Sequence, residues 1–144
     1  MDSIVRELSN GIDGSLFVDN FSILYKTKGS IDTIERQLQL QLNKMEIWAH
    51  ENGFKFSTNK TVAVHFCKKR KCTRQPDLKL CKERLPVKDE AKYLGVTFDS
   101  KLSFLPHIKD LKKRCQLSLN ALKILSNPEW GGDAETLLHL YRSI

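Results

Sequence analysis

A carboxylate that a tight turn would expose is the first candidate for chemistry in this sequence. Asp19 and Asn20 separate two short β-favouring runs within residues 16–25, and this pattern predicts a hairpin with the Asp-Asn pair at its tip. Such a turn aims the Asp19 carboxylate outward, and carboxylate oxygens are ligands that suit Mg²⁺. An Asp-Asn pair is also common in turns that bind no metal, so the pattern alone leaves both interpretations open.

A second candidate is a set of residues of zinc-ligating types. His65, Cys67, Cys72 and Cys81 could supply four ligands, but their spacing matches no common zinc module, and zinc is therefore the minor alternative. The four cysteines, of which Cys115 is the last, include no CxxC pair. Without a secretory route we expect them to be reduced.

The basic residues are concentrated in the second part of the chain. The formal net charge is +7; residues 1–60 carry 7 basic against 8 acidic residues (−1), and residues 61–144 carry 17 against 9 (+8). Clustered Lys and Arg bind phosphate by releasing counterions, so a nucleic acid is a candidate partner. An ordinary solvated surface is the alternative.

Helices are predicted where apolar residues recur at helical spacing. The first runs over residues 30–52, with Ser30 as a natural N-cap and Gly53 as the stop. A second, amphipathic helix is predicted from about Ser103 to Leu125. Its basic residues Lys109, Lys112, Lys113 and Arg114 are either its solvated face or a set of phosphate contacts. Asp133 is expected to cap a last helix that reaches residue 144.

Strands are predicted at several short β-favouring runs. These are residues 54–56, 61–66, 78–80 and 92–98, with a basic loop around residues 68–76. In the last strand, Gly95 would let another backbone approach closely.

No run approaches the ~18 consecutive apolar residues that a membrane span requires. Residues 1–8 include Asp2, Arg6 and Glu7, where a secretory signal would be apolar. We therefore expect an intracellular protein without membrane contact, and the sequence does not separate nucleus from cytoplasm.

The block Phe17-Val18-Asp19-Asn20-Phe21 resembles the catalytic hairpin of reverse transcriptases from non-LTR (LINE-type) retrotransposons, which reads aromatic-Val-Asp-Asp-Phe. Later blocks follow in that family's order from about Ser15 to the C-terminus. They are Gly53 to Phe56 with Asn59-Lys60-Thr61, then Tyr93 to Asp99, then Leu102, Phe104, His107 and Ile108, and finally Asn127 to Gly132 with Leu140-Tyr141.

The resemblance implies an α+β fold: a partial palm of antiparallel strands and a packed helix over residues 1–101, followed by a helical thumb over residues 102–144. It implies RNA-directed DNA polymerase chemistry on an RNA template and a DNA primer, with Mg²⁺ held by carboxylates. The site residues that it implies are Asp19 and Asn20 at the metal, Lys60 near the incoming triphosphate, Tyr93, Leu94 and Gly95 at the primer, and Lys109, Lys112, Lys113 and Arg114 along the duplex.

The sequence departs from the family's pattern in two ways that bear on catalysis. Asn20 replaces the second hairpin Asp, and a neutral amide is a weaker ligand for a hard divalent cation. The resemblance also implies that the chain begins after the strand and fingers that carry the family's other metal-binding Asp. We therefore expect an inactive fragment, whose rival interpretations are a non-catalytic nucleic-acid-binding remnant and a decayed reading frame.

Overall fold

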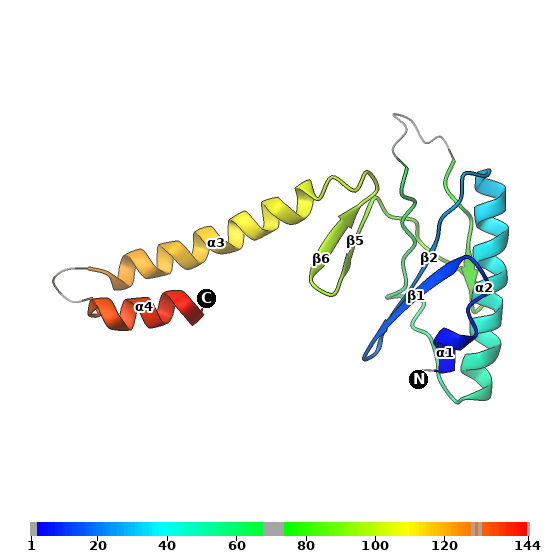
Figure 1. The fold of residues 1–144 in the computed structure, drawn as a ribbon, viewed down its shortest axis with the longest axis horizontal. Helices are drawn as coiled ribbons and strands as arrows, with labels where there is room; N and C mark the ends of the chain where they lie inside the picture. The colour runs from blue at the N-terminus through cyan, green and yellow to red at the C-terminus, as the bar shows by residue number, and fades with distance from the viewer. Residues whose placement is uncertain (1–2, 68–73, 128, 130, 144) are drawn as a thin grey trace. The chain divides into compact units, whose positions relative to one another are not determined.

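A computed structural model describes residues 3–67, 74–127, 129 and 131–143 (Figure 1). The architecture is mixed α and β, with three separate two-stranded antiparallel sheets among the described residues. The chain divides into two compact units, residues 1–103 and 104–144. The first unit contains α1 (Ser3–Arg6), β1 (Ile12–Phe17), β2 (Asn20–Tyr25), α2 (Ile31–Glu51), β3 (Lys79–Leu80), β4 (Glu83–Arg84), β5 (Glu90–Tyr93) and β6 (Val96–Asp99), and the second contains α3 (Leu105–Leu125) and α4 (Ala134–Ser143).

Helix α2 forms where the sequence predicts it, because both of its ends carry local stop signals. The Ser30 side chain accepts a hydrogen bond from the Thr33 N–H, as an N-cap does. At the other end Gly53 has φ +72°, a left-handed conformation that ends the helix without steric cost.

The core of the first unit consists of two adjoining clusters that pack along one face of α2. One cluster joins α1 to α2 through Ile4, Met45, Trp48 and Ala49, and the other joins α2 to residues 78–85 through Leu42, Leu78, Leu80 and Leu85. Ile23 and Phe56 pack against both clusters, so the β1–β2 hairpin is attached to the same core. Burial of these side chains from water is the main force that holds the unit together.

Gln41 is a fully buried polar residue within this core, and the apolar pattern of α2 did not reveal it. Its Oε1 accepts from the Ser9 N–H at 2.9 Å, and its Nε2 donates to the Glu7 carbonyl at 3.2 Å. The side chain thus satisfies the backbone of the segment that leads into β1, which compensates the cost of burying an amide.

Strand β1 begins at Ile12, earlier than the sequence pattern indicated. Gly14 lies inside the strand, where a Cβ would overlap the Leu8 side chain. The absence of a side chain at this position therefore lets residues 7–9 pack closely against the hairpin.

The predicted strands at residues 54–56 and 61–66 are wrong. Both segments are irregular apart from an isolated bridge between Ala63 and Val87. The Ala63 N–H donates to the Pro86 carbonyl, and the Ala63 carbonyl accepts from the Lys88 N–H. The Trp48 and Phe54 rings stack with centroids 5.4 Å apart, which indicates that aromatic packing determines the path of residues 54–56 more than strand pairing does.

Residues 79–84 form the small β3–β4 hairpin, and backbone groups of Lys79 and of the preceding Asp77 bind side chains of α2. The Lys79 N–H and carbonyl both bond to the Gln39 amide, and the Asp77 N–H donates to Glu35. These side chains take the place of a neighbouring strand, and so the predicted run at residues 78–80 remains short.

The predicted single strand at residues 92–98 is also wrong, because it is a hairpin made of β5 and β6. Tyr93 pairs with Val96, and the turn consists of Leu94 and Gly95, with φ 47° and 85°. A Cβ on Gly95 would meet no atom within 4 Å. The glycine is therefore explained by its left-handed turn position, and not by the close backbone approach that we expected.

The second unit consists of α3 and α4, and neither helix contains a buried residue. Asp133 caps α4 as predicted: its carboxylate accepts from the Thr136 N–H at 2.8 Å and from the Thr136 hydroxyl at 3.1 Å. These hydrogen bonds to the ionised form lower the pKa of Asp133. Across the residues that the structure describes, no helix combines the length and apolarity needed to cross a membrane.

Candidate functional site

The predicted metal-binding carboxylate lies in the turn of the β1–β2 hairpin. Phe17 pairs with Asn20, so the turn residues are Val18 and Asp19, and Asn20 is the first residue of β2 rather than part of the tip. Val18 has φ 55° and is 74% exposed. A β-branched residue is strained in this left-handed region, which a two-residue hairpin turn requires at its first central position.

Asp19 and Asn20 form the donor set of this turn. The Asn20 Nδ2 donates to the Asp19 Oδ1 at 3.4 Å, a long contact that engages one oxygen of the exposed carboxylate. No group of three His, Cys, Asp or Glu side chains gathers anywhere in the described part of the chain. One carboxylate and one amide do not fit a complete two-metal site, so we derive no catalytic step through Mg²⁺, and Asp19 is at most one ligand of such a site.

Lys60 lies on an exposed turn between Ser57 and Thr61. The Lys60 and Thr61 N–H groups donate to the Ser57 carbonyl at 3.2 and 3.0 Å, and the Thr61 hydroxyl donates to the same oxygen at 2.8 Å. None of the ion pairs found among the described residues involves Lys60. Its role beside a triphosphate stays a prediction.

Tyr93, Leu94 and Gly95 lie together at the tip of the β5–β6 hairpin. The Leu94 side chain is 48% exposed, whereas the Tyr93 hydroxyl donates to the carbonyl of Ser15 at 3.2 Å and lies 3.3 Å from its Oγ. Ser15 belongs to β1, so this contact connects the predicted primer-binding hairpin to the hairpin that carries Asp19. No motif or periodicity in the sequence marks Ser15, and the one available signal is its position in the strand just before the Asp19 turn.

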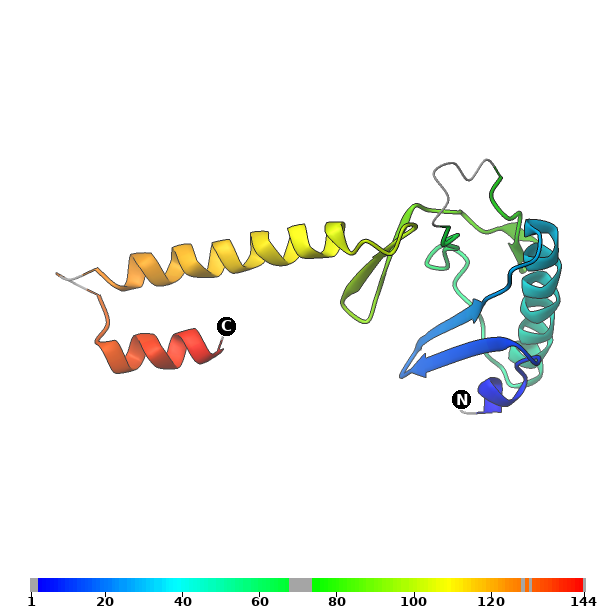
Figure 2. The same cartoon turned by 45° about the horizontal axis from the view of Figure 1, so that its top comes forward.

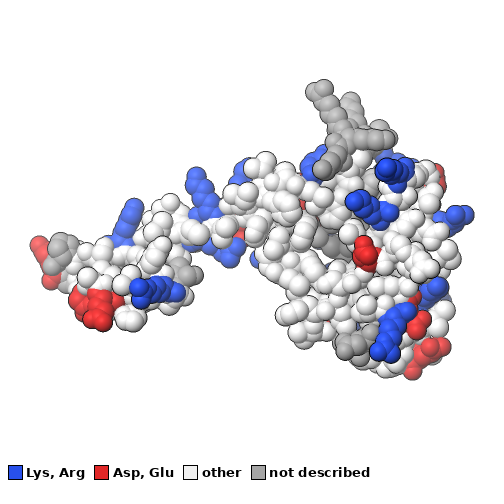
Figure 3. Space-filling view, viewed as in Figure 1, with Lys and Arg blue, Asp and Glu red and all other residues white. Residues whose placement is uncertain are grey.

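Three of the four predicted basic residues on α3 share one face. Lys109, Lys112 and Lys113 line an open groove of about 300 Å³ together with Gln116 and Leu117. Blue side chains in Figure 3 mark Lys and Arg residues along this helix. Spacings of three and four residues place side chains on the same side of a helix, so the three lysines can meet one row of phosphates.

Arg114 is separated from these lysines. Successive helix residues turn by about 100°, so Arg114 lies about 100° from Lys113 and farther from the other two. Its Nε pairs with the Asp110 Oδ2 at 3.2 Å. The predicted group of four is thus divided into a lysine triplet and an arginine that has its own acidic partner.

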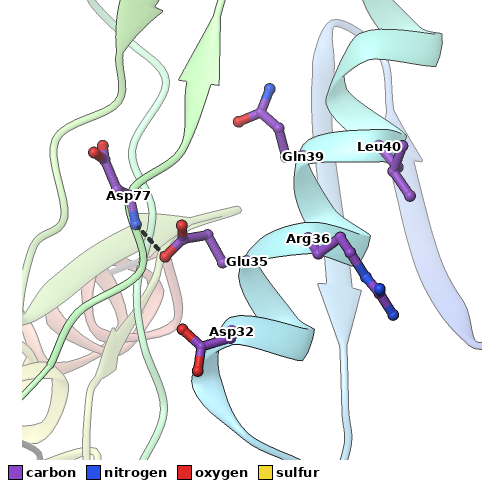
Figure 4. A pocket seen from close by; sticks show the side chains of 6 residues that line it. All are labelled: Asp32, Glu35, Arg36, Gln39, Leu40 and Asp77. Carbon is purple, nitrogen blue, oxygen red and sulfur yellow. Dashed lines mark hydrogen bonds between the residues drawn. The ribbon is translucent and has the colours of Figure 1, made fainter.

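A second groove, of about 290 Å³, lies between the first turns of α2 and residue 77 and is lined by Asp32, Glu35, Arg36, Gln39, Leu40 and Asp77. In Figure 4 the Glu35 side chain points at the Asp77 backbone, where it accepts the N–H at 3.1 Å, and Arg36 points away. The Arg74 guanidinium pairs with both Asp32 and Glu35. Because these carboxylates already have partners, the groove is explained as packing between α2 and the following segment.

The zinc alternative is not supported by the described residues. Cys67 is disulfide-bonded, which contradicts the expectation that all four cysteines are reduced, whereas Cys81 and Cys115 are free. Burial raises the pKa of the Cys81 thiol, with Glu46 and Glu83 adding to the effect, and this disfavours the thiolate that zinc requires. Cys72 and the basic run at residues 68–71 lie outside the described residues.

Curated proteins of Drosophila melanogaster are similar to this chain. A 115 kDa protein in the type-1 retrotransposable element R1DM is 28% identical over 131 residues, which cover 91% of this chain and 12% of that protein. A protein named "Probable RNA-directed DNA polymerase from transposon BS" is 29% identical over 111 residues, which cover 77% of this chain and 12% of that protein. The chain therefore spans a small part of each relative. No protein-family model and no solved structure matches it.

Proposed function

Because the homologues of this chain are proteins of non-LTR retrotransposons, one of them named as an RNA-directed DNA polymerase, we propose that the chain is a segment of a retrotransposon reverse transcriptase. In this proposal residues 1–101 are part of the palm and residues 102–144 are part of the thumb. The observation that carries it is the block from Phe17 to Phe21, whose Asp19 lies in an exposed, strained hairpin turn.

Each element of the proposed segment has a distinct task. Asp19 supplies one carboxylate ligand to Mg²⁺, with Asn20 as a weak neutral neighbour, and Mg²⁺ when bound would stabilise charge on the transferring phosphates. Lys60 is exposed and free to meet a triphosphate. Leu94 and Gly95 present an exposed turn to the primer, and the lysine triplet of α3, residues 109, 112 and 113, contacts the phosphates of the template–primer duplex.

We expect no polymerase activity from the chain alone. The described residues supply one exposed carboxylate at the turn where the family uses two, and they gather no further group of acidic ligands around it. A hard divalent cation binds more weakly when a neutral amide replaces a carboxylate. Primer extension by the purified chain with Mg²⁺ or Mn²⁺ would overturn this expectation.

The metal assignment is tested by titrating the purified chain with Mn²⁺ and following free Mn²⁺ by electron paramagnetic resonance. Asp19→Ala should abolish the tightest binding, because it removes the one charged ligand of the turn. Asp13→Ala is the matched control, since Asp13 is an exposed carboxylate of the same hairpin that lies away from the turn. Equal Mn²⁺ affinity in the wild type and in Asp19→Ala would refute the role of Asp19.

A second candidate function is nucleic-acid binding without catalysis. It is favoured by the Asn20 contact with Asp19, which replaces a carboxylate pair, and by the lysine triplet, which needs no metal. In that case Lys112→Ala/Lys113→Ala weakens binding equally for all nucleic-acid sequences, and Asp19→Ala changes neither Mn²⁺ binding nor nucleic-acid binding. The same two assays therefore separate the two functions.

A further inference from the structure

One side-chain contact links the two hairpins whose turns carry the proposed metal and primer residues. The Tyr93 hydroxyl, on β5, donates to the Ser15 carbonyl at 3.2 Å and lies 3.3 Å from the Ser15 Oγ, although the two residues are 78 positions apart. The β1–β2 and β5–β6 sheets are separate, so no backbone ladder between them determines how they are placed.

The contact lies close to both turns. Tyr93 directly precedes Leu94 and Gly95, and its partner Val96 directly follows them. Ser15 lies three residues before Val18, and at a rise of about 3.3 Å per residue the contact is about 10 Å from the Asp19 turn. Figures 1 and 2, which differ by 45°, both show the two hairpin tips near each other.

The chemistry of the contact suits a positioning role. A phenolic hydroxyl on a rigid ring fixes a direction as well as a distance, and its acceptor here is a main-chain carbonyl, which belongs to the hairpin framework. Tyr93 was predicted to bind nucleic acid, but its polar group is already engaged by Ser15. The exposed part of the β5–β6 tip is the Leu94–Gly95 turn that follows.

We propose that Tyr93 is a positioning residue whose hydroxyl holds the Leu94–Gly95 turn beside the Asp19 turn, so that both turns meet the same primer terminus. The meeting of both turns at one primer terminus rests on the proposed function, whereas the link between the hairpins does not. The Tyr93 hydroxyl thus acts through the two turns that it brings together, and not by touching the nucleic acid.

The link is tested by hydrogen–deuterium exchange of the full chain, read in peptides that cover residues 12–25 and 90–99. In Tyr93→Phe, which keeps the ring, amide exchange should rise about threefold in both hairpins, as expected for losing one exposed hydrogen bond. Ser15→Ala should give a smaller rise, because the main-chain acceptor remains. Tyr141→Phe is the control, since this tyrosine is 63% exposed on α4. Unchanged exchange of residues 12–25 in Tyr93→Phe would overturn the link.

The shared primer terminus is tested by photocrosslinking with a template–primer whose last primer nucleotide is thiothymidine. The wild type should crosslink to both hairpin peptides. Tyr93→Phe should lower the crosslinking yield at one hairpin peptide relative to the other. Tyr141→Phe should leave this ratio of yields unchanged. An unchanged ratio in Tyr93→Phe would overturn the positioning role. If the wild type crosslinks to neither hairpin although exchange shows the link, the proposed function fails and the link stands.

Discussion

Removal of two lysines from α3 is the perturbation that tests the nucleic-acid surface most directly. Lys112 and Lys113 line one groove with Lys109, and none of the three takes part in the ion pairs found among the described residues. Lys112→Ala/Lys113→Ala keeps the helix, because alanine has the highest helix propensity, and removes two of the three charges.

The expected magnitude follows from counterion release. Each lost phosphate contact lowers the slope of log affinity against log salt concentration by about 0.9. With 1 M salt as the reference, each lost contact therefore weakens binding about eightfold at 0.1 M salt. The double variant, which loses two contacts, should bind about sixtyfold more weakly. The slope itself should fall by about 1.8. These values assume that both lysines contact phosphate in the wild-type complex.

Arg114→Ala is the matched control on the same helix. Arg114 pairs with Asp110 at 3.2 Å and lies on another face. An exposed pair of this kind contributes about 0–1 kcal/mol to stability, so its loss should leave the fold intact. The salt-dependence slope of Arg114→Ala should change by less than about 0.5. A residue that makes no phosphate contact in the wild type releases no counterions, so its removal changes the slope little.

Fluorescence anisotropy of a labelled RNA–DNA duplex, repeated at several salt concentrations, gives both the affinity and the slope for each variant. Circular dichroism checks that the helix content of each variant equals that of the wild type. A double variant with the wild-type slope, or an Arg114→Ala variant with the larger loss, would refute the assignment of this face to phosphate.

Three further predictions concern the turn, the core and the last helix. Asn20→Asp restores a second carboxylate beside Asp19, and isothermal titration should show tighter Mn²⁺ binding; unchanged affinity would mean that the turn is no metal site. Gln41→Ala leaves the Ser9 N–H and the Glu7 carbonyl without their partner, and it should lower the free energy of unfolding by about 2 kcal/mol in urea titrations. A loss within experimental error would show that the Gln41 side chain does not hold residues 7–9 against α2. The pKa of Asp133 is lowered in the folded chain, so its capping contribution is present above the unfolded pKa and is lost as pH falls through the folded one. At pH values below the usual pKa range of aspartate, Asp133→Asn should therefore lose less helicity than the wild type, as measured by circular dichroism. An acid transition equal to that of the wild type would argue against the cap.

Elements with local signals can be predicted from the amino-acid sequence. Helix α2 lies between Ser30 and Gly53 because a cap and a left-handed glycine act within one turn of the chain. The same is true of the Asp133 cap on α4 and of the hairpin that presents Asp19. These interactions join residues that are few positions apart, so their pattern can be read without knowing the rest of the fold.

The strand predictions failed where a short β-favouring run had more than one way to satisfy its backbone. Residues 92–98 form a hairpin in which Leu94 and Gly95 adopt left-handed turn conformations. Only the glycine does so without steric cost, and a pattern of apolar residues does not reveal the turn. The backbone of Lys79 bonds to the Gln39 side chain of α2 instead of to a further strand. Strand pairing depends on which partner is nearby, and the partner is chosen by the tertiary structure.

The grouping of the candidate residues depends on contacts between distant parts of the chain. The tertiary structure placed the Tyr93 hydroxyl on Ser15, 78 positions away, and it buried Gln41 against the segment before β1. The division between Arg114 and the neighbouring lysines is local instead, because it follows from the turn of the helix and from an i,i+4 pair with Asp110. Residue types and order therefore indicate which chemistry is present, whereas the relative placement of these groups depends on long-range packing and hydrogen bonds, which no local pattern encodes.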